Sequence, residues 1–247
     1  MLESLEQSNI KKMSVETPEK EPELLFDPEK DMNEVDKENA LGIYKGIFTE
    51  QPRHAISYTV ALKKILPEFK PERSDFDRWI EDNGTLHSQA LTHDFIAGKH
   101  DFYKAQSDLK ELFPDIYIDP ELLKELLKEI ERVKNGRDVY YYFSLIELAN
   151  KLGMHVDYDQ SAVPDFEGCI NKITKIEDFV KYLALAKRLN LPIEIKLSEE
   201  KKADIKGAVY NQGFDNISYI ADVLDIQRKP GKLDNEDKGS IPEQKQF

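Results

Sequence analysis

The distribution of apolar residues along the chain is repetitive. An aromatic residue is followed ten positions later by leucine in four stretches, 102–112, 142–152, 179–189 and 214–224. The fourth and eighth positions of these stretches are also apolar, and they hold Ala105, Leu145, Tyr182 and Ile217, then Leu109, Ala149, Ala186 and Ala221. Spacing of 0, 3, 7 and 10 places residues on one face of a helix. Because the closing leucines are 40, 37 and 35 residues apart, the pattern predicts an all-α fold of stacked helical hairpins.

The same stripe predicts an earlier, irregular unit and the helix ends. Residues 55–65 repeat the spacing 47 residues ahead of the next unit, and residues 41–48 form a further apolar helix that would cap the stack. Gly153 and Asn190 follow the closing leucines of two units, and these residue types readily take the left-handed conformation that ends a helix. Asp119-Pro120 and Ser198 are helix-start signals. We expect a helical repeat domain over residues 40–227.

The two ends of the chain have a different composition. Residues 1–39 are dominated by Glu, Lys, Pro, Ser and Asp, and residues 228–247 carry mixed charge. Such segments hold too few large apolar groups to offset the entropy of ordering the backbone, so both are predicted to be disordered. The triplet Leu24-Leu25-Phe26 is the exception in the first segment. It is read either as a short docking motif or as a contact with the protein's own surface.

From about Ala55 to Ile226 the chain resembles the helical-hairpin repeat proteins, among them the tetratricopeptide and pentatricopeptide solenoids. Its interval drifts from 47 to 35 residues, so the resemblance is to an architecture and carries no binding residues. It implies an irregular α-solenoid, and such solenoids mostly bind proteins or peptides along a concave face. A compact all-α domain is the alternative, since every amphipathic helix repeats its apolar spacing.

Composition restricts the partners and the location. The formal net charge is −13, the sequence pI is about 5.0, and residues 1–40 hold twelve acidic and five basic residues. An acidic chain disfavours nucleic acid and anionic lipid, which need clustered Lys and Arg. Cys169 is the only cysteine, which rules out an intrachain disulfide. The sequence contains neither a secretory signal nor an apolar run long enough to span a membrane, and we expect a cytoplasmic protein.

Histidines gather in one segment. His87, His93 and His100 lie within fourteen positions, and Asp94 directly follows His93. The His93-Asp94 pair resembles that of HD-type phosphohydrolases, in which imidazole and carboxylate hold a divalent metal that activates water. That family spreads its ligands over several helices, and no distant His-Asp partner is evident here. A metal-dependent hydrolase that uses His87, His93, Asp94 and His100 is therefore the alternative function, and a polar link between helices is the simpler interpretation.

The densest aromatic run, 140–143, supplies the candidate binding residues. Tyr140 and Tyr141 align with Glu177 and Asp178 of the next unit, positions that look exposed, and paired exposed tyrosines are enriched in binding surfaces. Packing under the preceding helix is the other interpretation of these tyrosines. Cys169 with His155 would be the one nucleophile pair the sequence offers, although a small buried side chain explains the cysteine as well. We expect a non-enzymatic module without cofactors that binds a protein or peptide partner.

Overall fold

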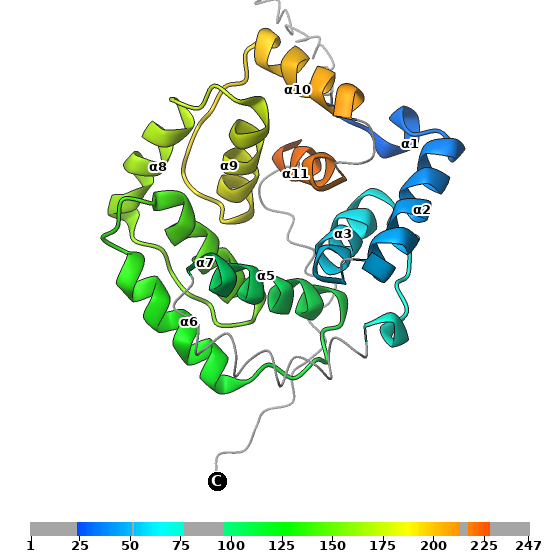
Figure 1. Cartoon of the computed structure of the whole chain (residues 1–247). Coiled ribbons are helices and arrows are strands. Elements are labelled where there is room, and N and C mark those ends of the chain that lie inside the picture. Colours follow the sequence, from blue (N-terminus) through cyan, green and yellow to red (C-terminus); the bar gives the residue numbers. More distant parts are fainter. Residues whose placement is uncertain (1–23, 51, 77–95, 213–216, 228–247) are drawn as a thin grey trace, which may run out of the picture.

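The computed structural model of the chain describes residues 24–50, 52–76, 96–212 and 217–227, and every regular element in these ranges is a helix (Figure 1). The predicted all-α fold is confirmed. Longer helices form two layers. The inner layer consists of α3 (Pro52–Ile65), α5 (Ile96–Leu112), α7 (Val139–Lys151), α9 (Ile176–Arg188) and α11 (Ile217–Gln227). The outer layer consists of α2 (Glu34–Glu50), α6 (Pro120–Val133), α8 (Val163–Ile170) and α10 (Glu199–Gln212). Short turns complete the set, namely α1 (Pro28–Asp31), η1 (Arg73–Asp75) and η2 (Gln160–Ala162).

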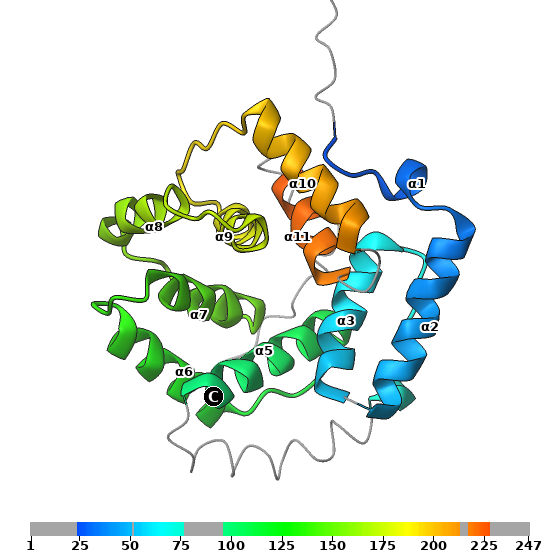
Figure 2. The same cartoon turned by 45° about the horizontal axis from the view of Figure 1, so that its top comes forward.

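The inner helices form a closed ring. Each contacts the next along the chain, and α11 also packs on α3, so the last hairpin returns to the first (Figures 1 and 2). The outer helix α2 packs on α3, α6 on α7, α8 on α7 and α9, and α10 on α9 and α11. Successive inner helices therefore pack side by side and close on themselves, and within the described residues they leave no open concave face of the kind an α-solenoid has.

Neighbouring inner helices run in the same direction. His100, near the start of α5, bonds Ser144 near the start of α7 at 3.2 Å, whereas Glu111 near the end of α5 pairs with Lys151 at the end of α7 at 3.1 Å. Other pairs join like ends in the same way: Lys104–Ser57, Arg188–Glu147, Arg188–Asp225 and Lys64–Asp225. All five inner helices thus begin at one end of the ring, which we call the rim, and end at the other, which we call the base.

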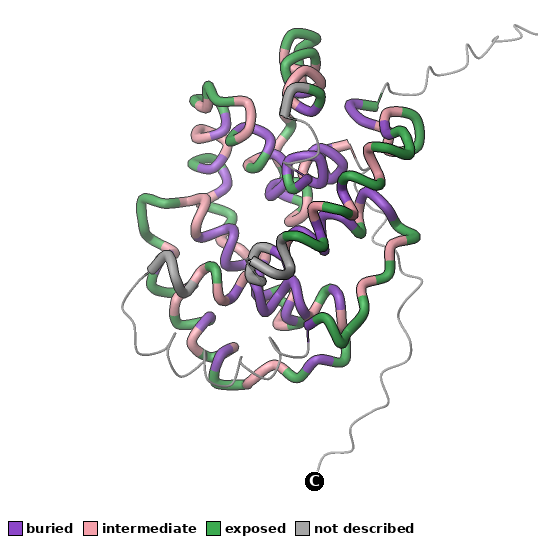
Figure 3. The backbone as a smooth tube through the Cα atoms, turned by 45° about the vertical axis from the view of Figure 1, so that its right-hand side comes forward, coloured by how far each residue is buried: buried purple, intermediate pink, exposed green. Residues whose placement is uncertain are grey.

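The apolar core lies mainly where the helices face one another. The stripe residues Leu109, Leu145, Ala149 and Ala186 are buried, and α6 turns Leu122, Leu126, Ile130 and Val133 inward. A smaller cluster fills the contact of α3 with α5, comprising Ile56, Val60, Phe76, Ala105, Leu109, Leu112 and Ile116. Figure 3 shows buried backbone concentrated in the inner helices and exposed backbone along the outer ones. Burial of this apolar surface is the main stabilisation of the ring.

Helix ends follow the local chemistry. Gly153 and Asn190 have positive φ angles of 91° and 51°, as predicted for residues that end a helix, and the next amides, of Met154 and Leu191, return to carbonyls of the last turn. The carboxylate of Asp119 accepts from the amide of Glu121 at 2.9 Å, with Pro120 beginning α6.

Part of the predicted N-terminal tail, residues 24–39, is folded onto the protein. Leu25 and Phe26 are buried, and α1 and the start of α2 occupy part of 28–39. The amides of both residues donate to Oε1 of Gln227, at 2.9 and 3.1 Å, and Gln227 Nε2 donates back to the Phe26 carbonyl at 2.6 Å. Residues 24–32, which we call the strap, are thus held against the end of α11. Assigning 24–39 to a disordered tail was wrong because the apolar triplet contacts the protein itself; residues 1–23 and 228–247 lie outside the described residues.

Candidate functional site

The two tyrosines predicted as a binding patch are not free on the surface. Both are partly buried against the core. The ring of Tyr140 lies 4.4 Å from that of Tyr182, and the Tyr141 hydroxyl donates to Glu129 Oε1 at 3.2 Å. The alignment with exposed acids failed because α6 and α9 flank these positions of α7. Tyr140 instead lines a cavity at the centre of the ring.

Of the four predicted metal ligands, the structure describes only one. His87, His93 and Asp94 lie outside the described residues. The His100 imidazole reaches Ser144 Oγ, and burial lowers the pKa of His100. Within the ranges that the structure covers, no group of three or more His, Cys, Asp or Glu side chains could hold a metal ion. The metal site stays a prediction for the three residues outside these ranges.

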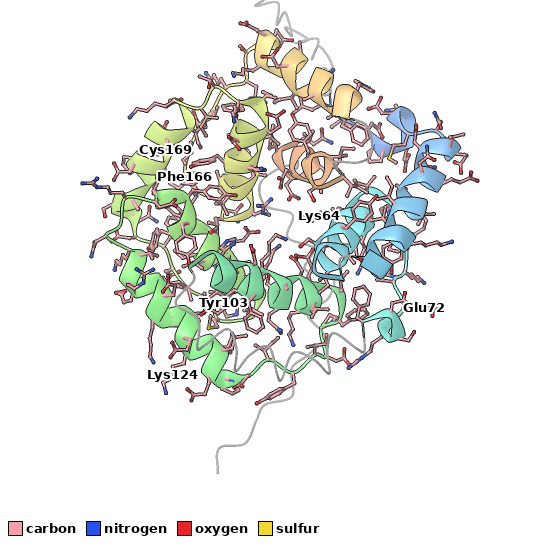
Figure 4. All side chains as sticks on the ribbon, in the orientation of Figure 1. Lys64, Glu72, Tyr103, Lys124, Phe166 and Cys169 are labelled. Atoms are coloured by element: carbon pink, nitrogen blue, oxygen red, sulfur yellow. The ribbon has the colours of Figure 1, made fainter. Side chains whose placement is uncertain are left out.

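A cavity of about 270 Å³ occupies the axis of the ring, and all five inner helices line it. We call it the axial cavity. Its charged and hydrogen-bonding side chains are Ser57 and Lys64 on α3, His100, Lys104 and Asp108 on α5, Tyr140, Ser144, Glu147 and Lys151 on α7, Lys181 and Arg188 on α9, and Ser218 and Asp222 on α11. Figure 4 shows Lys64 on the inner side of α3, facing the axis, whereas Lys124 points outward from α6.

Near the rim, Lys104 is held in place by two partners. Its Nζ donates to Asp108 Oδ2 at 2.6 Å and to Ser57 Oγ at 2.8 Å, and the Ser57 hydroxyl donates to the same carboxylate oxygen at 2.7 Å. The Asp108 side chain is almost fully buried, whereas that of Lys104 is 44% exposed. The ammonium group therefore lies between a buried carboxylate and solvent.

His100 and Ser144 also meet near the rim. The Ser144 hydroxyl donates to the Tyr141 carbonyl at 2.8 Å, and His100 Nε2 lies 3.2 Å from the same hydroxyl oxygen. Both side chains contribute hydrogen-bonding atoms to the cavity wall.

The base of the cavity is closed by a buried charge network around Arg188. Its guanidinium pairs with Glu147 through Nε at 2.6 Å, and through Nη1 with Asp222 at 2.9 Å and Asp225 at 3.0 Å. Lys64 adds a second cation on Asp225 at 2.9 Å. Burial alone would raise the pKa of Asp225, but Lys64 and Arg188 hold it below its usual value; for Asp222 burial prevails and the pKa is raised.

Lys151 extends this network toward α5. Its Nζ lies 3.1 Å from Glu111 and 3.4 Å from Glu147. Burial would lower the pKa of Lys151, but the two carboxylates raise it above its usual value. The ammonium group therefore stays charged at neutral pH, as does Arg188.

Two polar groups on the cavity wall retain hydrogen-bonding capacity. Among the described residues the Tyr140 hydroxyl has no hydrogen-bond partner, and burial raises the pKa of Tyr140 to about 12, so it remains a donor at neutral pH. Asp222 accepts from Arg188 through Oδ1 alone, which leaves its second carboxylate oxygen available. An open donor and an open acceptor in one cavity are a common means of orienting a small ligand.

The sequence signal for this lining was present in the repeat. With the first stripe residue counted as zero, position two of four units is Ser57, Lys104, Ser144 and Lys181, all of which line the cavity. Position nine is Lys64, Glu111, Lys151 and Arg188, all charged and part of the networks above. Positions two and nine share a helix face, and this face differs from the one that carries the apolar stripe at positions 0, 3, 7 and 10.

The remaining candidates lie away from the axis. Cys169 is partly buried on the outer helix α8 (Figure 4), and His155 is exposed in the link after α7. Among the helices that the structure describes, none is long and apolar enough to cross a membrane. No family model, curated protein or solved structure matches the chain. The function is therefore inferred from the axial cavity itself.

Proposed function

We propose that this protein binds a small polar molecule in the axial cavity. The observation that carries the proposal is that each of the five inner helices contributes a charged or hydroxyl side chain to one cavity of about 270 Å³. This volume lies just below the roughly 300–1,000 Å³ typical of sites for drug-sized ligands. A compact metabolite fits it better than a peptide or a lipid.

The ring does not need a polar axis in order to fold. Its helices are held together by apolar contacts between neighbours, and burying ion pairs such as Arg188 with Glu147 contributes little stability compared with apolar side chains of similar volume. A polar lining that the fold does not require, with an open hydroxyl on Tyr140 and an open carboxylate oxygen on Asp222, is explained by a ligand.

The experiment that tests the proposal compares two tryptophan variants. Ser218 is exposed and lines the cavity, so Ser218→Trp should fill the cavity without disturbing the core. Ala203→Trp, at an exposed position on the outer helix α10, is the matched control. In a thermal-shift screen of polar metabolites, ligands should stabilise the wild type and Ala203→Trp but not Ser218→Trp. Equal shifts in all three proteins, or no shift in any, would count against the proposal.

The functions predicted from sequence remain untested. A protein-binding module would lack the open concave face that solenoids use, because the ring closes through α3 and α11. Its candidate residues Tyr140 and Tyr141 are engaged inside the fold, and we no longer assign them to a protein partner.

A further inference from the structure

The cations that line the axial cavity lie at two levels along its axis. At the base, the three cations Arg188, Lys64 and Lys151 are matched by the carboxylates Glu147, Asp222, Asp225 and Glu111. Toward the rim the cavity is lined by Lys104 and Lys181, and by a single acid, Asp108. The rim also holds acids that do not line the cavity, since Asp178 lies beside Lys181 and Asp101 lies beside His100. The two rim lysines therefore differ from the base cations in exposure.

Both rim lysines keep contact with solvent. The Lys104 side chain is 44% exposed and that of Lys181 is 54% exposed, whereas Lys64 at the base is 17% exposed. The nearest acid to Lys181 is Asp178, at 3.9 Å, a distance that is long for a charge-assisted hydrogen bond. Each ammonium group carries three donor protons, so both lysines can add an anionic ligand to their present contacts.

The direction of the inner helices also favours an anion at the rim. Because neighbouring inner helices are parallel, the positive ends of their dipoles gather at the rim. The N-terminus of α9 has no side-chain cap, and its first turn carries Glu177 and Asp178.

We propose that the ligand of the axial cavity is a small organic anion, whose phosphate or carboxylate group is bound at the rim by Lys104 and Lys181 and whose hydroxyl-bearing body reaches Tyr140 and Asp222. This inference rests on the binding function proposed above and specifies its chemistry. The lysines recognise the oxyanion by charge-assisted hydrogen bonds. The Tyr140 hydroxyl and the open Asp222 oxygen supply one donor and one acceptor for the uncharged part.

Three probes with the same carbon skeleton test whether binding needs an anionic group. Inorganic phosphate tests whether the anionic group binds without the carbon skeleton. Glycerol 3-phosphate, glycerate and glycerol differ in the anionic group, and binding to the full chain is measured by titration calorimetry at constant ionic strength. We expect both organic anions to bind at millimolar concentration, phosphate more weakly, and glycerol not measurably. His100 provides a second readout, because Lys104 beside it contributes to lowering the pKa of its imidazole and a bound anion should raise it in an NMR titration, with His100→Gln assigning the signal.

Matched lysine variants locate the anion. Lys181→Gln removes a rim cation, and Lys128→Gln removes an outer lysine with the same kind of pairing to an acid three residues earlier. Loss of one charge-assisted hydrogen bond should weaken glycerol 3-phosphate about tenfold in Lys181→Gln and leave Lys128→Gln unchanged. Lys104→Gln should weaken it further, provided that circular dichroism shows it folded, since it also leaves Asp108 without its cation.

The outcomes separate this inference from the proposed function. Failure of both organic anions to bind the wild type, equal affinity for glycerol and glycerol 3-phosphate, or unchanged binding in Lys181→Gln would each overturn the anion assignment. If glycerol or another neutral metabolite bound the wild type but not Ser218→Trp, the proposed function would stand while the anion assignment failed. Failure of every metabolite in the thermal-shift screen would reject both.

Discussion

The residue that organises the base of the ring is Arg188, because it places three carboxylates from two other helices around one guanidinium. A lysine could not do this, since only the planar guanidinium presents five donors in a fixed geometry. Two of its partners, Asp222 and Asp225, are three residues apart on α11, yet their pKa values shift in opposite directions. Asp225 has Lys64 as a second close cation, at 2.9 Å, while Asp222 bonds to Arg188 alone.

This difference predicts unequal losses of stability for substitutions of Asp225 and Asp222. Asp225→Asn should lower the free energy of unfolding at pH 7 by roughly 1 to 3 kcal/mol, because the folded state favours ionised Asp225. The pKa of Asp225 is lower in the folded state, so its contribution is complete above the unfolded pKa and disappears as pH falls through the folded pKa. The pKa of Asp222 is raised, so its ionisation opposes folding as pH rises, and Asp222→Asn should cost less at pH 7. Urea unfolding from pH 3 to 8 measures both, and a larger loss for Asp222→Asn would contradict the assignment.

The tyrosines of α7 give a second prediction at this scale. Replacing Tyr140 and Tyr141 together by serine should destabilise the protein by on the order of 2 to 4 kcal/mol, because both rings pack between helices. If both tyrosines were exposed, as the repeat alignment indicated, the double substitution would leave stability unchanged. Tyr117→Ser is the control, since that ring is 78% exposed and its loss should cost less than about 0.5 kcal/mol. Denaturant midpoints of the two variants decide between the interpretations.

At the scale of the element, the strap joins the beginning of the described chain to its last helix. Phe26 is 1% exposed, and Gln227 holds the strap backbone by three hydrogen bonds. Average composition over the first forty residues concealed this element, because two buried side chains are enough to dock a short segment when its backbone donors find partners. The apolar triplet was the signal, and only the structure shows what it contacts.

Docking of the strap predicts different effects for Phe26 and Leu24, which lie two residues apart. Phe26→Ala should lower the free energy of unfolding by about 3 to 5 kcal/mol, as for other buried aromatic truncations. Leu24→Ala, at a side chain that is 45% exposed, should change it by less than about 0.5 kcal/mol. Limited proteolysis of the wild type should leave a core that begins near residue 24. A stable core that begins near residue 40, together with unchanged stability in Phe26→Ala, would show that the strap is not docked.

At the scale of the whole molecule, sequence predicted the hairpins but not their closure. The apolar stripes of 102–112, 142–152 and 179–189 coincide with α5, α7 and α9, because apolar spacing fixes which helix face is buried. Closure depends on the small rotation between successive hairpins, which no single repeat encodes. The stripe of the last unit is also less informative, since α11 packs on α9, α10 and α3 and is buried on most sides. The axial cavity exists only because the ring closes, so the candidate site could not be predicted from the stripes.

Closure predicts how the protein responds to loss of its last hairpin. In an open stack each repeat contacts only its neighbours, and deletion of a terminal repeat leaves the others folded. In the ring, ending the chain at residue 198 removes α10 and α11, which takes a packing partner from α3 as well as from α9 and leaves Lys64 without Asp225. We expect the truncated protein to lose more helical content than the deleted residues contribute, and to unfold at a lower urea concentration. The slope of its unfolding free energy against urea concentration should also be smaller than expected for its length. A chain ending at residue 227 keeps every described element and is the control.

Circular dichroism during urea unfolding measures the helical content and the urea midpoint of both chains. If the truncated protein kept all its remaining helix and unfolded at the same midpoint as the control, contact between the first and last inner helices would not hold the ring together.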